Sequence, residues 1–124
     1  MGQAGRVRVV IVDDQPIFRH AARHCLEARG YEVVAEAGCA ASALAAVARH
    51  EPDALLLDID LGDDDGFAVC DAVTRNRPGL AVVLISADRN FEHVPEQIES
   101  CGARGFVRKE QLPRVDLGRF WQSA

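Results

Sequence analysis

Short apolar runs alternate with helical patterns along the chain, and this alternation restricts the fold more than any other feature. The run Val7–Val12 is β-branched and Leu80–Ile85 is wholly apolar, as in strands that are buried on both faces. Strands and helices that alternate through short connections form a parallel sheet with helices on both faces, so we expect an α/β fold. The predicted strands are Val7–Val12, Tyr31–Ala37, Ala54–Leu57, Leu80–Ile85 and Gly105–Arg108. The predicted helices cover 16–29, Ser42–His50, Gly66–Arg77, Pro95–Cys101 and a last segment from Leu112.

The size and charge of the chain exclude several classes of protein. It has 124 residues, enough for one domain, and no apolar run approaches the roughly 20 residues of a membrane helix. The formal net charge is −5, so nucleic acid is not expected as a direct partner, because phosphate binding requires a basic face. We expect a cytoplasmic protein without a signal peptide. The cysteines form no CxxC pair and are expected to be reduced and half-buried: Cys25, Cys39, Cys70 and Cys101.

Polar side chains follow the predicted strands at the points where the strands end. Asp13 and Asp14 follow the first strand, Asp58 the third, Ser86 the fourth and Lys109 the fifth. Ligands of open parallel sheets bind beyond the carboxyl ends of the strands, so we expect these five side chains to converge at one edge. Lys109 is the only lysine of the chain, and its ammonium group suits a phosphate oxygen or a carboxylate.

Three carboxylates at one edge require a counter-charge. Two carboxylates about 4 Å apart repel each other by about 4 kcal/mol at an effective dielectric constant of about 20. Either one of them takes a proton or a divalent cation binds, and a few hard oxygen ligands open to water suit Mg²⁺. A calcium loop of the EF-hand type is excluded, because counting back from Gly66 puts Leu61 at the first ligand position. The remaining aspartates, Asp63–Asp65, are expected to form a solvated loop.

Taken together, these motifs resemble the receiver domain of two-component response regulators. They are Asp13-Asp14, Asp58 at the end of an apolar strand, Ser86-Ala87, and Lys109 within GARGFVRK. The resemblance covers about residues 7–112, and we expect residues 1–124 to form a single receiver domain. It implies a flavodoxin-like (βα)5 fold, with a doubly wound parallel five-stranded sheet in the order 2-1-3-4-5. The opening stretch VRVVIVDDQPIFR is similar to receivers that precede a helix-turn-helix output domain.

The resemblance also implies a role for each matching residue. Asp58 matches the aspartate that accepts the phosphoryl group, and Ser86 and Lys109 match the catalytic residues that contact this group. Ser86 and Phe106 match the two residues of the family's conformational switch. Phosphoryl transfer passes through a loose transition state, so placement and charge neutralisation supply most of the catalysis. The implied Mg²⁺ ligands are Asp13, Asp14, Asp58 and the backbone carbonyl of Asp60.

The same resemblance implies partners and a limited activity. A sensor histidine kinase or a phosphotransfer protein would donate the phosphoryl group, and a downstream protein or a fused output domain would respond to it. A homodimer through the face of the fourth helix, fifth strand and fifth helix is a further expectation. The domain would catalyse only its own phosphorylation and slow dephosphorylation, so we do not expect an enzyme that turns over a substrate.

Two departures from the family's pattern lie beside the expected acceptor. Gly62 stands where the family usually has proline, four residues after Asp58, and a looser loop is therefore expected. Asp60 and Asp88 both place acid beside Asp58. We predict that these two carboxylates tune the lifetime of the phosphoryl group before hydrolysis.

Two further departures lie toward the end of the chain. Pro95 predicts a short or displaced fourth helix, and Pro113 and Gly118 make the last helix doubtful, because both residues disfavour a helix interior. Phe120 and Trp121 in this tail are expected to pack in the core.

Two other functions fit parts of the sequence. The DID motif at 58–60 is similar to the nucleophile motif of haloacid-dehalogenase-like phosphatases, with Asp58 as the nucleophile. Here the motif follows the third predicted strand rather than the first, and the chain is short for that fold and its cap. The second alternative is a receiver-like interaction module that works without phosphorylation.

Overall fold

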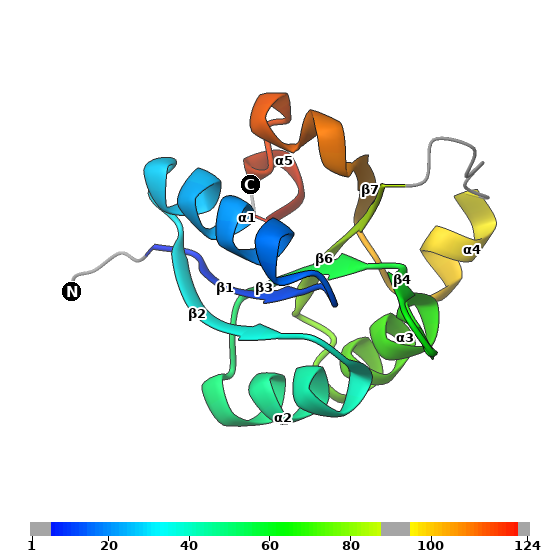
Figure 1. Cartoon of the computed structure of the whole chain (residues 1–124). Coiled ribbons are helices and arrows are strands. Elements are labelled where there is room, and N and C mark those ends of the chain that lie inside the picture. Colours follow the sequence, from blue (N-terminus) through cyan, green and yellow to red (C-terminus); the bar gives the residue numbers. More distant parts are fainter. Residues whose placement is uncertain (1–5, 88–94, 122–124) are drawn as a thin grey trace.

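Strands and helices alternate along the chain in the computed structural model, which describes residues 6–87 and 95–121 (Figure 1). The predicted alternation is therefore confirmed. The strands are β1 (Arg8–Val12), β2 (Glu32–Ala37), β3 (Ala54–Asp58), β4 (Asp60–Leu61), β5 (Asp64–Asp65), β6 (Ala81–Ser86) and β7 (Gly105–Arg108). The helices are α1 (Pro16–Ala28), α2 (Ala40–His50), α3 (Gly66–Asn76), α4 (Pro95–Ser100), the 3-10 helix η1 (Lys109–Arg114) and α5 (Gly118–Trp121).

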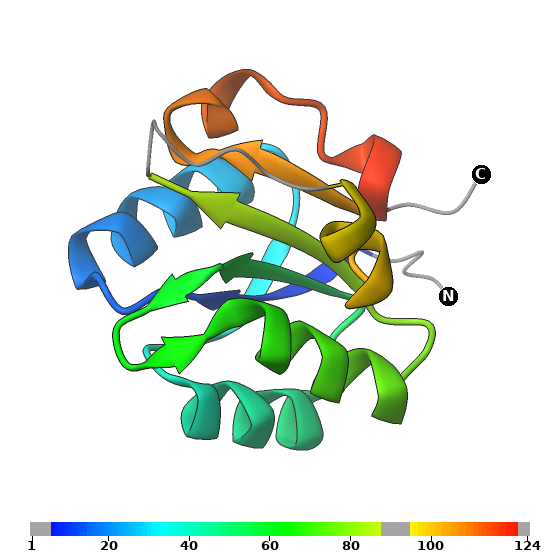
Figure 2. The ribbon, with the colours of Figure 1, turned by 90° about the vertical axis from the view of Figure 1, so that its right-hand side faces the viewer.

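Five of these strands form one parallel sheet in the order β2-β1-β3-β6-β7. With β6 and β7 counted as the fourth and fifth long strands, this is the predicted flavodoxin-like order 2-1-3-4-5. The register places Val12 beside Ala37 on one side and Leu57 on the other, and it places Asp58 beside Ile85. Since the strands are parallel, their carboxyl ends meet at one edge. Figure 2 shows the sheet between two layers of helices.

Successive residues of the central strands β1, β3 and β6 enter different cores. In β1, Val10 and Val12 contribute to the core under α2, α3 and α4, whereas Val9 and Ile11 contribute to the core under α1, η1 and α5. All four side chains are completely buried. A central parallel strand with a helix layer on each face has no solvated side, so its residues are apolar without alternation. This explains the continuous apolar runs in the sequence.

Local capping moves the start of α2 from the predicted position. The helix begins at Ala40, two residues before Ser42, because Cys39 and Ser42 form a reciprocal capping box. The Cys39 N–H donates to the Ser42 hydroxyl oxygen over 3.2 Å.

The four cysteines are free, but the prediction that they are half-buried holds only for Cys25. Cys39 is exposed, and Cys70 and Cys101 are buried. Burial raises the pKa of the Cys70 thiol, whose S–H donates to the Cys101 carbonyl over 3.1 Å. These two residues therefore pack α3 against the end of α4.

The end of the chain forms two short helices where one was predicted. Pro113 lies inside η1, and α5 begins at Gly118, whose N–H donates to the Asp116 carboxylate over 3.0 Å. Trp121 is buried, as predicted, whereas Phe120 is only half-buried. The fourth helix, α4, is short as predicted, with 6 residues.

Residues 60–65 form a small hairpin that the sequence did not predict. Strands β4 and β5 pair antiparallel, and Gly62 opens the two-residue turn between them with a φ of +73°. A glycine with positive φ at this position is typical of the type II′ hairpin turn. Proline cannot adopt a positive φ, so this backbone excludes proline at position 62.

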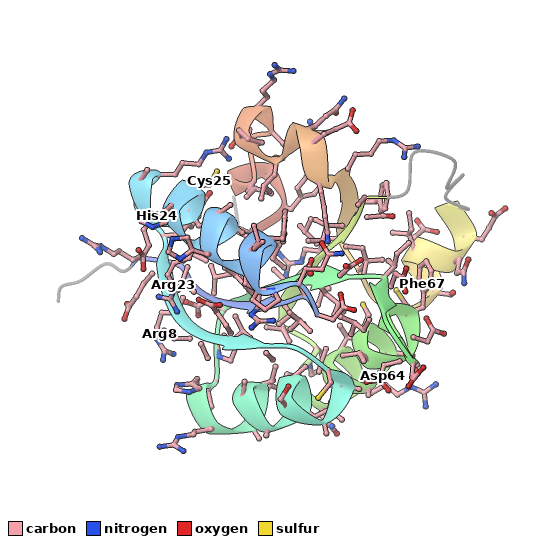
Figure 3. All side chains as sticks on the ribbon, viewed as in Figure 1. Arg8, Arg23, His24, Cys25, Asp64 and Phe67 are labelled. Atoms are coloured by element: carbon pink, nitrogen blue, oxygen red, sulfur yellow. The ribbon has the colours of Figure 1, made fainter. Side chains whose placement is uncertain are left out.

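Two of the three aspartates predicted to form a solvated loop, Asp63–Asp65, bond to helix ends, so the prediction of an unstructured loop is wrong for these two, although Asp65 is exposed. Asp64 is half-buried, and its carboxylate accepts the N–H of Ala40 at the start of α2 over 2.9 Å. Figure 3 shows Asp64 beside this end of α2. Asp65 caps α3 by accepting the N–H of Phe67 over 2.9 Å. Asp63 is exposed, as predicted.

Gly66 at the start of α3 has no room for a side chain. A Cβ atom there would lie 2.4 Å from the Asp58 carbonyl oxygen and 2.4 Å from the Ile59 Cα, and these backbone atoms cannot rotate away. We therefore expect Gly66→Ala to lower the free energy of unfolding by about 1–3 kcal/mol, as overpacked substitutions do. Urea unfolding measures this change.

Gly79 supplies the matched control for this substitution. A Cβ atom at Gly79 would meet no heavy atom within 4 Å, so Gly79→Ala is expected to leave stability unchanged or slightly raised. Equal losses in both variants would contradict the close-packing explanation.

Candidate functional site

The carboxyl edge of the sheet brings together the five side chains that the sequence placed there. Asp58 is the last residue of β3 and Ser86 the last of β6, while Lys109 directly follows β7. Asp13 and Asp14 directly follow β1. Asp13, Asp58 and Ser86 are buried, and Asp14 is exposed. The edge therefore holds buried charge with one carboxylate open to solvent.

Lys109 joins two of the buried acids. Its Nζ lies 2.6 Å from Asp13 Oδ2 and 3.0 Å from Asp58 Oδ2, and its side chain is only 10% exposed. Burial alone would lower the pKa of Lys109, but the two carboxylates outweigh burial and raise it. The amine therefore remains charged at neutral pH, as a neutralising group for the acids must.

Asp13 is fixed on several sides. Its N–H donates to the Ala37 carbonyl over 2.9 Å, and its Oδ1 accepts the Gln15 N–H over 2.8 Å. Its other carboxylate oxygen, Oδ2, pairs with the Lys109 amine over 2.6 Å. Both carboxylate oxygens of Asp13 are therefore held at the edge of the sheet.

Asp58 has an altered acidity. Burial raises its pKa to about 6, and the Asp13 charge acts in the same direction. The Asp60 N–H, which donates to Asp58 Oδ1 over 3.0 Å, and the Lys109 amine oppose this rise. Ionisation of Asp58 therefore costs more at this edge than in water, and added positive charge would reduce that cost.

The acidic residues fit a small divalent cation. One carboxylate oxygen each from Asp13, Asp14 and Asp58 lies within 4.8 Å of the other two. Hard oxygen ligands, one of them solvent-exposed, are the donor set that Mg²⁺ prefers, because it keeps several of its waters. The burial of Asp13 and the raised pKa of Asp58 agree with this assignment, because a bound cation would lower the cost of their charges. The predicted contribution of the Asp60 carbonyl stays a prediction.

The structure describes three of the four remaining predicted residues, namely Ser86, Phe106 and Asp60. Ser86 is 2% exposed, and Phe106 is half-buried against the core under α2, α3 and α4. Asp60 is exposed beside Asp58, while Asp88 lies outside the described residues. The structure therefore supplies the positions of Ser86, Phe106 and Asp60 but not their predicted roles.

Two residues of α1 contribute contacts that sequence reasoning did not assign to the site. The Lys109 Nζ lies 4.4 Å from the centre of the Phe18 ring, close enough for a cation–π interaction. The Arg19 guanidinium donates to the backbone carbonyl of Asp13 over 2.6 Å. Neither contact follows from spacing along the chain alone.

Comparison with known proteins identifies relatives over most of the chain. The model of the response regulator receiver domain family matches residues 9–116. The nitrate/nitrite response regulator protein NarP of Escherichia coli (strain K12) is 34% identical over 118 residues, which cover 94% of this chain and 54% of NarP. The "Probable transcriptional regulatory protein NarL" of Mycobacterium tuberculosis (strain ATCC 25618 / H37Rv) is 38% identical over 109 residues, or 87% of this chain and 50% of that protein. The chain thus spans about half the length of these relatives.

Solved structures of receiver domains share the fold of this chain. A NarL signal receiver domain from Mycobacterium tuberculosis has a TM-score of 0.79 and 32% sequence identity, covering 95% of this chain and 98% of that chain. A CheY-like receiver domain protein from Methanospirillum hungatei JF-1 has a TM-score of 0.76 at 24% identity, covering 90% of this chain and 85% of that chain.

No helix in the described part of the present chain is long and apolar enough to cross a bilayer.

Proposed function

This chain belongs to the response regulator receiver domain family, and on that premise we propose that Asp58 accepts a phosphoryl group in a two-component phosphorelay. The observation that carries the proposal is the position of the Lys109 amine, 3.0 Å from Asp58 and 2.6 Å from Asp13. A single charged amine between buried acids can neutralise a phosphoryl group that arrives at Asp58.

The proposed chemistry is an in-line displacement at phosphorus. A carboxylate oxygen of Asp58 attacks the phosphorus of a phosphohistidine, the P–N bond breaks, and the imidazole leaves as the acyl phosphate forms. Lys109 neutralises the transferred oxygens, and the Ser86 hydroxyl donates a hydrogen bond to one of them. When bound by Asp13, Asp14, Asp58 and the Asp60 carbonyl, Mg²⁺ supplies further charge neutralisation.

We further propose a switch between Ser86 and Phe106. Phosphorylation adds nearly two negative charges at Asp58, and Ser86 would move toward them. Phe106 lies on β7, which pairs with the strand β6 that carries Ser86, and would fill the space that Ser86 leaves. This movement would change the surface made by α4, β7 and α5, which is where an effector would detect the phosphorylated state.

The proposed partners follow from this role. A sensor histidine kinase or a phosphotransfer protein donates the phosphoryl group in the cytoplasm, without membrane contact by this domain. Several relatives are named as transcriptional regulators, and a fused output domain or a separate downstream protein would then respond. A homodimer through the α4-β7-α5 surface is one form of that response. The domain itself does not contact nucleic acid, in agreement with its net charge of −5.

Asp60 and Asp88 are proposed to tune how long the phosphoryl group lasts. Carboxylates beside the acyl phosphate change the electrostatic environment of the attacking water, so their removal is expected to change the rate of dephosphorylation. The test is the lifetime of the phosphorylated state in the double variant Asp60→Ala, Asp88→Ala. An unchanged lifetime would remove this role from both residues.

Incubation with acetyl phosphate and Mg²⁺, followed by intact-mass spectrometry, tests the proposed function. A stable adduct of one phosphoryl group per chain supports phosphate acceptance and self-catalysis. Release of many phosphate ions per chain without an adduct would favour a phosphatase that uses Asp58. No adduct and no phosphate release, also with a histidine phosphodonor, would favour an interaction module that works without phosphorylation.

A further inference from the structure

A guanidinium group of α1 bonds to the backbone of the acidic pair Asp13-Asp14. The Arg19 Nη1 donates to the Asp13 carbonyl over 2.6 Å, and its side chain is only 20% exposed. We infer that Arg19 is a positioning residue for Asp13 and Asp14, an inference that rests on the proposed use of these carboxylates to bind Mg²⁺.

Arg19 is itself held in place by Glu36 on β2. Its Nε lies 3.2 Å from one oxygen of Glu36, and Arg23 Nε lies 2.7 Å from the other. Figure 3 shows Arg23 between α1 and β2. Arg23 also donates to the Val33 carbonyl over 3.3 Å. Glu36 thus bridges two arginines, of which Arg19 contacts the acidic pair and Arg23 contacts β2.

Gly38 leaves the space that Arg19 occupies. A Cβ atom at Gly38 would lie 3.3 Å from Arg19 Nη1 and 3.9 Å from the Asp13 carbonyl oxygen. The first distance is tighter than an ordinary van der Waals contact, so any larger residue would push the guanidinium away from the carbonyl. The end of β2 therefore contributes both the carboxylate that orients Arg19 and the opening through which it reaches β1.

The Asp13 carbonyl belongs to the peptide group that links Asp13 to Asp14. Fixing this peptide plane limits the directions in which both carboxylates can point. Two hydrogen bonds fix the atoms on either side of this peptide group. The Asp13 N–H donates to the Ala37 carbonyl, and the Gln15 N–H donates to Asp13 Oδ1. Arg19 holds the carbonyl oxygen of this peptide group. Partners that orient metal ligands typically affect metal affinity by about tenfold or more.

Charge and position predict opposite effects when Arg19 is replaced. Arg19 is a cation near a cation site, so its loss through charge alone would tighten Mg²⁺ binding. If Arg19 acts by positioning Asp13 and Asp14, its removal would weaken Mg²⁺ binding, because the two carboxylates would no longer be pre-oriented. The direction of the change therefore separates the two explanations.

Arg23→Met is the matched control for Arg19→Met. Both variants remove an arginine from the same oxygen pair of Glu36 and change the net charge equally, but only Arg19 contacts Asp13. Mg²⁺ is titrated into each folded protein, and the dissociation constant is read from the amide NMR shifts of Asp14 and Gln15. This readout needs no phosphorylation and reports the folded molecules only, so a loss of stability does not affect it.

We expect Arg19→Met to raise the Mg²⁺ dissociation constant about tenfold. Arg23→Met should leave it unchanged or lower it, and Arg19→Lys, which keeps a donor, should fall between wild type and Arg19→Met. An unchanged or tighter dissociation constant in Arg19→Met overturns the positioning role, as does an equal increase in Arg23→Met. Failure of the proposed function itself has a different signature, because the wild-type protein would then show no Mg²⁺-dependent shifts at Asp14.

Discussion

Asp58→Asn is expected to abolish the phosphoryl adduct that acetyl phosphate and Mg²⁺ form on the wild-type chain. Asparagine keeps the size of the side chain but lacks the carboxylate that attacks phosphorus, so no acyl phosphate can form. Asp58 is 4% exposed at the carboxyl edge, and its Oδ2 lies 3.0 Å from the Lys109 Nζ. Intact-mass spectrometry measures the fraction of adduct in each protein.

Asp63→Asn is the matched control for this experiment. It makes the same chemical change at the exposed turn of the β4–β5 hairpin and should leave the adduct fraction unchanged. An adduct of wild-type yield on Asp58→Asn would show that another residue accepts the phosphoryl group. That result would refute the assignment of Asp58.

Lys109→Met is expected to lower the free energy of unfolding by about 3 kcal/mol at neutral pH without Mg²⁺, because removal of one partner leaves buried charge uncompensated. Asp13 is fully buried and Asp58 is 4% exposed, so water cannot replace the amine well. Methionine fills the space of the aliphatic part of the side chain and removes only the charge. Urea unfolding in a chelator measures the loss.

The stability lost in Lys109→Met should depend on pH, and the raised pKa of Asp58 determines in which direction. Its pKa is about 6 in the folded chain against 3.8 in the reference state, so the folded state holds the proton more tightly. Ionisation of Asp58 therefore lowers stability as the pH rises from 3.8 to about 6. Without Lys109 this cost is larger, and the difference between Lys109→Met and wild type should shrink as the pH falls below about 6.

Arg75→Met controls for the loss of a cation elsewhere. Arg75 is 77% exposed and pairs with Asp71 one turn away on α3, so its loss should change stability by less than about 1 kcal/mol. Saturating Mg²⁺ should restore much of the stability of Lys109→Met, because a bound cation compensates the same acids. A deficit that neither acid nor Mg²⁺ reduces would show that Lys109 contributes packing rather than charge.

The sheet and its order could be predicted from sequence because each central strand must be apolar on both faces. Val9–Val12 and Ala81–Ile85 are buried residue by residue, which leaves little freedom in the pattern. The convergence of Asp58 and Lys109 followed from the same rule, since every parallel strand ends at the same edge. Neither prediction required knowledge of side-chain contacts.

The parts that sequence reasoning missed depend on contacts between distant segments. The Asp64 carboxylate bonds to the N–H of Ala40, 24 residues away. This long-range contact helps to order the hairpin, whose sequence is typical of an acidic loop. Arg19 reaches the Asp13 carbonyl beside Gly38, which lies in the turn after β2 and leaves room for the guanidinium. Spacing along the chain shows which side chains share an edge, but it does not show how far a long side chain reaches across two elements.

The single lysine gives this protein a built-in chemical probe. Lys109 carries the only side-chain amine in the 124 residues, so an amine-selective reagent can modify one position within the fold. Its nitrogen lies between two carboxylates and over the Phe18 ring, and the speed of acylation would depend on how tightly these neighbours enclose it. Labelling kinetics can therefore follow the occupancy of the acidic edge in a mixture, without isotopes and without an engineered reporter.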